Sequence, residues 1–139
     1  MRSFLFLFIL IYLAATSSTT NAQAVVVNKS VGQKEISKNA LRAIFGMRLN
    51  KWPNGTGVKV FVLRDNAPLH IKFCKKVLNV FPHQLRRAWD RLIYSGTGQA
   101  PFEVASEKEM RQKIANTPGA IGYLVMEKND TDVKILQVR

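Results

Sequence analysis

The 139-residue chain has one cysteine, two histidines and few acidic side chains. Its single cysteine, Cys74, excludes an intramolecular disulfide and a cysteine-rich zinc module. Asp and Glu together number 9 against 21 Lys and Arg, which gives a formal net charge of +12. Such an excess of positive charge favours anionic partners, among them phosphate-like ligands, envelope polyanions and nucleic acid.

Enzymatic motifs are also missing from the sequence. No G-x-S-x-G, P-loop, dinucleotide-binding or H-E-x-x-H pattern occurs, and the carboxylates are scattered. His70 and Cys74 lie four residues apart on an expected helix, so they could form a nucleophilic pair or half of a metal site. The same residues fall on the helix face that should be buried, which favours a structural role. We therefore expect no enzyme, no metal site and no cofactor.

One long apolar run is present, at the start of the chain. A single positive charge, Arg2, precedes it, and a run of small and polar residues follows. This layout is typical of a secretory signal peptide, with cleavage after Ala22 or Ala24. The apolar run is shorter than the roughly 20 residues that span a bilayer, so an uncleaved anchor is the less favoured alternative. We expect a signal peptide over 1–24 and an exported domain over 25–139, periplasmic or secreted, that does not span the membrane and does not bind nucleic acid.

Hydrophobic periodicity predicts both strands and helices in the mature chain. Apolar runs predict strands at 25–27, 58–63, 120–125 and 133–138. Amphipathic spacing predicts helices at 37–45, 68–81, 83–94 and 106–115, two of them capped by Ser37 and Ser106. The resulting order, β-α-β-α-α-α-β-β, predicts an α/β fold in which a mixed sheet is flanked by helices.

Two loops contain groups that could bind an anion. The first joins an expected strand to an expected helix, where free main-chain N–H groups and the positive end of the helix dipole favour an oxyanion. We expect its ligand-binding residues to be Arg64, Asn66, Leu69 and His70, with Arg64 as the charge contact and the N–H groups near Leu69 and His70 as donors. The alternative is that Arg64 is an ordinary surface residue at a strand end. The second loop, 95–98, follows a helix, and we expect it to be a C-terminal turn.

Several short motifs occur in an order that resembles a known family. They are VVVN at 25–28, IS at 36–37, IFG at 44–46, WPNG at 52–55, a strand ending in Arg64, and TPGAIGY at 117–123. The set resembles the phosphate-type substrate-binding proteins of ABC transporters, within the type 2 periplasmic binding-protein superfamily. The resemblance implies a single lobe of a two-lobed fold, non-catalytic recognition of phosphate or a related oxyanion, and a link to ABC-type phosphate uptake.

The chain departs from this family in the loop that follows the strand ending in Arg64. Family members have a Ser-Gly-Thr-type loop there that holds the phosphate, whereas this chain has Ala67-Pro68-Leu69-His70. Only Arg64 carries over from the motif. The alternative function is an envelope interaction module that kept the scaffold and lost the small-molecule ligand. The expected partners are thus a small anion such as phosphate, an ABC permease or other envelope protein, or a second copy of the chain.

Overall fold

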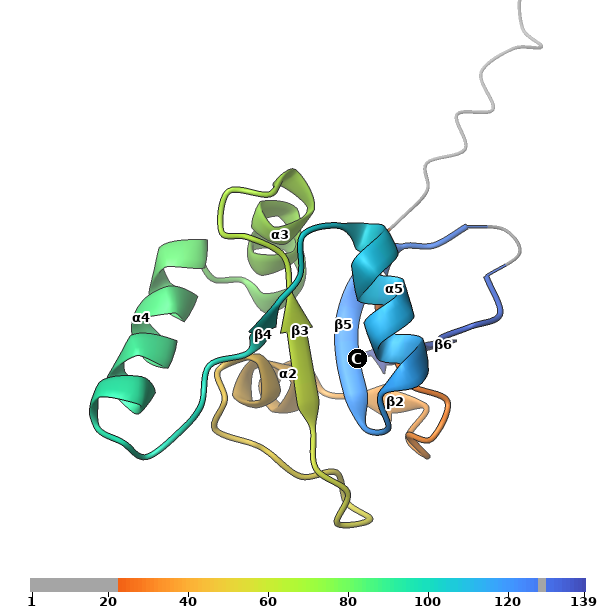
Figure 1. Ribbon diagram of the computed structural model, residues 1–139, viewed down its shortest axis with the longest axis horizontal. Helices are drawn as coiled ribbons and strands as arrows, with labels where there is room; N and C mark the ends of the chain where they lie inside the picture. The colour runs from red at the N-terminus through yellow and green to blue at the C-terminus, as the bar shows by residue number, and fades with distance from the viewer. Residues whose placement is uncertain (1–22, 128–129) are drawn as a thin grey trace, which may run out of the picture.

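The computed structural model describes residues 23–127 and 130–139, so the expected signal peptide lies, except for its last two residues, outside the described residues. Five strands form one sheet in the order β4-β3-β5-β1-β6 (Figure 1). Their bounds are β1 Gln23–Val27, β3 Lys59–Val62, β4 Phe102–Glu103, β5 Ala120–Val125 and β6 Lys134–Ile135. The sheet is mixed, because β3 runs parallel to β4 and β5 while β1 is antiparallel to β5 and β6.

Helices connect and cover these strands. They are α2 (Lys38–Phe45), α3 (Pro68–Phe73) continued by the π-helix η1 (Cys74–Leu78), α4 (Pro82–Tyr94) and α5 (Glu107–Asn116). A separate pair of two-residue strands, β2 (Glu35–Ile36) and β7 (Gln137–Val138), runs parallel beside the main sheet. The predicted fold class, a mixed sheet flanked by helices, is therefore confirmed.

The ends of the helices follow the local sequence closely. Ser37 accepts a hydrogen bond from the Ala40 N–H at the start of α2, and Ser106 accepts one from the Glu109 N–H at the start of α5. At the end of α4, the N–H groups of Gly96, Thr97 and Gly98 donate to carbonyls of the last helical turn. The loop 95–98 is thus the C-terminal turn that its sequence predicts.

Two predicted elements differ from the structure. The helix expected over 68–81 ends at Leu78, after which Asn79 is left-handed at φ 60° and Phe81 is extended ahead of Pro82. The strand expected over 133–138 is two short strands, because β6 pairs with β1 and β7 pairs with β2. The strands β2 and β4 were not predicted, since two residues carry no periodic pattern.

Neighbouring residues of β5 show how the sheet is covered on both faces. Gly122 faces α5, since a Cβ there would lie 2.6 Å from Ile114 Cδ1. Tyr123 faces the other side and stacks on Phe73, with ring centroids 4.1 Å apart. Figure 1 shows α5 in front of the sheet and α2 behind it. Burial on both faces explains why β5 reads as an unbroken apolar run.

Two of the short sequence motifs meet at one turn. The carbonyl of Gly119, in the TPGAIGY segment, accepts hydrogen bonds from Trp52 Nε1 at 2.9 Å and from the Lys59 N–H at 3.1 Å. Gly119 has φ +77°, and a Cβ on it would lie 2.2 Å from the carbonyl oxygen of Gly57. Both the left-handed backbone and the close approach require glycine here. The turn therefore fixes the start of β3 against the start of β5.

We predict that Gly119→Ala destabilises the protein by at least about 2 kcal/mol, because it adds left-handed strain to a clash with backbone. Gly32→Ala is the matched control, since a Cβ at Gly32 has nothing within 4 Å. Denaturant unfolding of both variants measures the difference. Equal free energies of unfolding would contradict the role assigned to this turn.

Candidate functional site

The candidate site lies at the carboxyl end of β3, where residues 63–67 lead into α3. Arg64 and Asn66 are exposed, Leu69 is half-buried and His70 is fully buried. No side chain caps α3 at this end, and Pro68 occupies its first turn. The first N–H groups of a helix have no partner inside it, so Leu69 and His70 present donors while Pro68 presents none.

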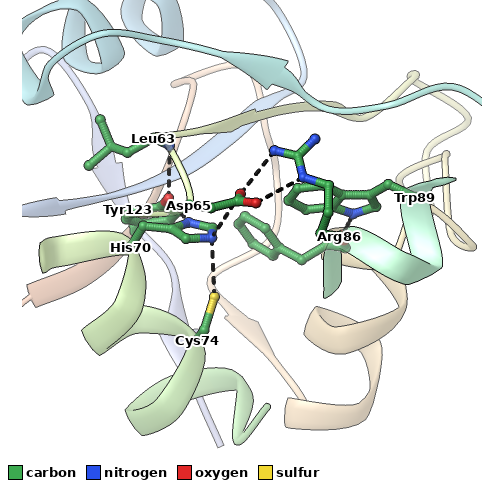
Figure 2. Close-up of polar contacts among 8 residues, drawn as sticks. Leu63, Asp65, His70, Cys74, Arg86, Trp89 and Tyr123 are labelled. Carbon is green, nitrogen blue, oxygen red and sulfur yellow. Dashed lines mark hydrogen bonds and ion pairs between the residues drawn. The ribbon is translucent and has the colours of Figure 1, made fainter. Parts of the chain in front are cut away.

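The side chain of His70 belongs to a buried chain of hydrogen bonds (Figure 2). The hydroxyl of Tyr123 accepts a bond from the Leu63 N–H at 2.9 Å and contacts His70 Nδ1. Because the hydroxyl already accepts from Leu63, we assign its own proton to the contact with Nδ1. The proton of the neutral ring is then on Nε2, which lies 3.5 Å from Cys74 Sγ. The chain thus links β5, β3 and α3 through a neutral imidazole.

Burial sets the charge states of these groups. It lowers the pKa of His70, because the cationic ring would be desolvated. It raises the pKa of the Cys74 thiol to about 12, so the thiolate is not formed near neutral pH. The pKa of Tyr123 is raised for the same reason. His70 and Cys74 are thus both fully buried, and neither an imidazolium nor a thiolate is favoured there.

A second cluster joins the same loop to α4. Asp65 accepts two hydrogen bonds from Arg86, one from Nε and one from Nη2, each 2.9 Å long. This bidentate contact lowers the pKa of Asp65 and raises that of Arg86. The guanidinium also lies 4.9 Å from the ring centroid of Trp89. Arg86, which the helical pattern assigns mostly to solvent, is therefore half-buried and committed to an ion pair.

The structure places the four expected ligand-binding residues on one segment, but their side chains differ in access. Arg64 is exposed and forms no ion pair within residues 23–127 and 130–139. Asn66 is exposed beside it. His70 offers a ligand only its main-chain N–H, since its ring is enclosed by Tyr123 and Cys74. The carboxylate of Asp65 lies in the same loop, 4.0 Å from His70 Nε2, and adds negative charge to it.

In the part of the chain that the structure describes, no group of three or more His, Cys, Asp or Glu side chains is arranged to hold a metal ion. No helix of the described residues has the length and apolar content needed to cross a bilayer.

Comparison with known proteins gives a likeness of fold. No family model and no curated protein matches the sequence. Among solved structures, an ABC-type phosphate transport receptor from Vibrio cholerae superposes with a TM-score of 0.64 at 15% identity, covering 84% of this chain and 45% of its own. A putative phosphate ABC transporter substrate-binding protein with bound phosphate from Clostridium perfringens gives 0.65 at 15%, covering 84% and 44%. PstS from Borrelia burgdorferi gives 0.65 at 17%, covering 85% and 47%.

This chain has the fold of one lobe of a phosphate-type binding protein. It spans less than half the length of the solved structures that it matches. The resemblance inferred from the ordered motifs is thus confirmed at the level of fold.

The sequence did not indicate which residues of other elements hold the segment 63–70 in place. Tyr123 was predicted only as part of the strand 120–125 and of the TPGAIGY motif, and its contact with His70 joins residues 53 positions apart. Asp65 and Arg86 are 21 positions apart and fall on a loop and a helix, so no periodicity relates them. An aspartate next to an expected anion-binding arginine was the one available signal, because a carboxylate there requires a counter-charge.

We predict that the protein loses stability as the pH falls through about 6.5, the ordinary pKa of histidine. The folded-state pKa of His70 is lowered, so the unfolded chain takes up its proton first and is favoured by acid. Unfolding in denaturant between pH 7.5 and 5.5 measures this slope. His70→Gln should flatten it, whereas His83→Gln, which changes an exposed ring, should leave it unaltered. An unchanged slope in His70→Gln would refute the assignment.

Proposed function

We propose that the protein is an exported, non-catalytic binding domain that recognises phosphate or a related oxyanion at the carboxyl end of β3. The observation that carries the proposal is Arg64, an exposed guanidinium without an ion pair in the described part of the chain, on a lobe with the fold of phosphate-binding proteins. Asn66 and the N–H groups of Leu69 and His70 would supply the remaining hydrogen bonds.

The affinity of such a site should be low. The loop lacks hydroxyl side chains, and the ionised Asp65 repels an anion even though Arg86 balances its charge. A single lobe also leaves one side of the ligand in water, where each ionic contact is worth less than in a closed cleft. We therefore expect a dissociation constant for phosphate in the millimolar range rather than the tight binding needed to capture trace phosphate.

A second candidate function is an envelope interaction module, with an ABC permease, another envelope protein or a second copy of the chain as partner. The Asp65–Arg86 ion pair favours this alternative, because the two side chains bind each other and so do not offer hydrogen-bond donors to a small ligand. Under this alternative, the positive surface would select an acidic partner face and make the association sensitive to salt.

Export is proposed from the amino-terminal sequence, and the fold bears on the cleavage site. Gln23 and Ala24 are the first residues of β1 and pair with Val125 and Leu124 of β5. Cleavage after Ala24 would remove both pairs, whereas cleavage after Ala22 would keep every β1 pair that the structure describes. Of the two expected positions, Ala22 and Ala24, we propose cleavage after Ala22, which would release the mature domain into the periplasm or the exterior.

The oxyanion function is tested by the binding of inorganic phosphate, measured by thermal shift and calorimetry at fixed ionic strength. Arg64→Gln should weaken binding by about tenfold, the loss of one charge-assisted hydrogen bond. Asp65→Asn should strengthen it, because the substitution removes a negative charge and releases Arg86. The matched control is Lys29→Gln, an equal change of charge on an exposed residue after β1, near the opposite end of β5.

Absence of a thermal shift with phosphate or sulfate would reject the oxyanion function. Salt-sensitive capture of an envelope protein, with no effect of the anion, would then favour the interaction module. Solution mass with and without phosphate tests whether two copies assemble around the ligand.

We also predict that the exported protein begins at Gln23. Intact mass and amino-terminal sequencing of protein recovered from the envelope fraction measure the cleavage position. A mature protein beginning at Val25, or an uncleaved chain in the membrane fraction, would contradict it.

A further inference from the structure

A hollow of about 380 Å³ lies between α2, η1 and α4, and no residue of the segment 64–70 lines it. Its apolar wall consists of Leu78, Val80, Leu85, Ala88 and Leu92. The volume falls within the range of small-molecule sites, which are mostly apolar with a few polar groups that orient the ligand.

Small residues border the hollow on two sides. Gly46 ends α2, and Ala88 lies on the face of α4 that the helical pattern assigns to the core. Trp89 draws α4 toward α2 by donating from Nε1 to the Phe45 carbonyl at 2.7 Å. Beside this contact, Ala88 and Leu92 stay half-buried, so part of the apolar face of α4 is left uncovered.

The polar side of the hollow carries charge of one sign. Arg42, Arg48 and Arg91 line it, and no acidic residue does. Arg42 is held in place, because its Nε donates to the Leu78 carbonyl at 2.6 Å and leaves its terminal nitrogens free of that contact. Arg48 and Arg91 are exposed. None of the three forms an ion pair within the described ranges.

We propose that this hollow binds an amphiphilic carboxylate, a molecule with one anionic head and an unbranched apolar tail. The tail would lie along Leu78, Leu85 and Leu92, and the head would accept hydrogen bonds from the arginines, whose planar forks match a carboxylate. Inorganic phosphate would leave the apolar wall wet, and a neutral lipid would leave the guanidinium groups unmatched. The proposal is independent of the oxyanion site at Arg64, because the two sites share no residue.

Decanoate, used below its micellar concentration, is the probe, and calorimetry with the purified protein is the measurement. We expect saturable binding of one decanoate per chain, no saturable binding of acetate or decyltrimethylammonium at the same concentrations, and no competition from phosphate. Arg48→Gln and Arg91→Gln should each weaken binding by about tenfold, as expected for one charge-assisted hydrogen bond. Ala88→Leu should weaken it at least as much by filling the hollow.

Arg87→Gln is the matched control, since it removes the same charge from an exposed position of α4 that does not line the hollow. It should leave decanoate binding unchanged. Circular dichroism and the unfolding midpoint verify that each variant is folded, and the two arginine variants test the site even if Ala88→Leu is unstable. Three results would overturn the proposal: no binding, many decanoates per chain, or equal binding by all variants. Binding of an acidic peptide but not of decanoate would overturn the class of ligand.

Discussion

The hydroxyl of Tyr123 is the polar contact on which the arrangement around the candidate site depends. It accepts from the Leu63 N–H at the end of β3 and meets the imidazole of His70 on α3, so one buried oxygen joins three elements. Leaving any of these groups unpaired in the core would cost about 1–3 kcal/mol. With the hydroxyl proton assigned to the contact with Nδ1, protonation of the ring would put a second proton between Nδ1 and the hydroxyl, which ties the geometry of the loop to the protonation state of His70.

The residues of the loop after β3 and of α3 therefore fall into two groups, one buried or ion-paired and one exposed. His70 and Cys74 belong to the buried group, and burial keeps both side chains uncharged. Asp65 is tied to Arg86, which fixes the loop to α4. The groups that a ligand could contact are Arg64, Asn66 and the N–H groups at the start of α3. The base of the loop is thus held by buried and ion-paired side chains, and its exposed cationic group is Arg64.

The sequence predicted those parts of the structure that are decided locally. The run AIGYLV at 120–125 predicted β5, and Ser37 predicted the start of α2, because burial on two faces and helix caps are encoded by neighbouring residues. It did not predict the contact of Tyr123 with His70 or of Asp65 with Arg86, because those pairs depend on how distant elements cross. The π-helical segment was also missed, since the apolar stripe continues through it to Phe81.

The two proposed sites would hold anions by different physical means. At Arg64 the ligand stays in contact with water, so the interaction is mainly Coulombic and weakens as salt screens it. In the hollow between α2 and α4 most of the free energy would come from burying apolar surface, about 25 cal/mol per Å², with the arginines orienting the head. Salt should therefore weaken the first interaction more than the second. The proposed mature domain lacks Arg2 and carries a net charge of +11, from 20 basic and 9 acidic residues, which would raise the local concentration of anions at both sites. Selectivity would then depend on the groups that each site presents.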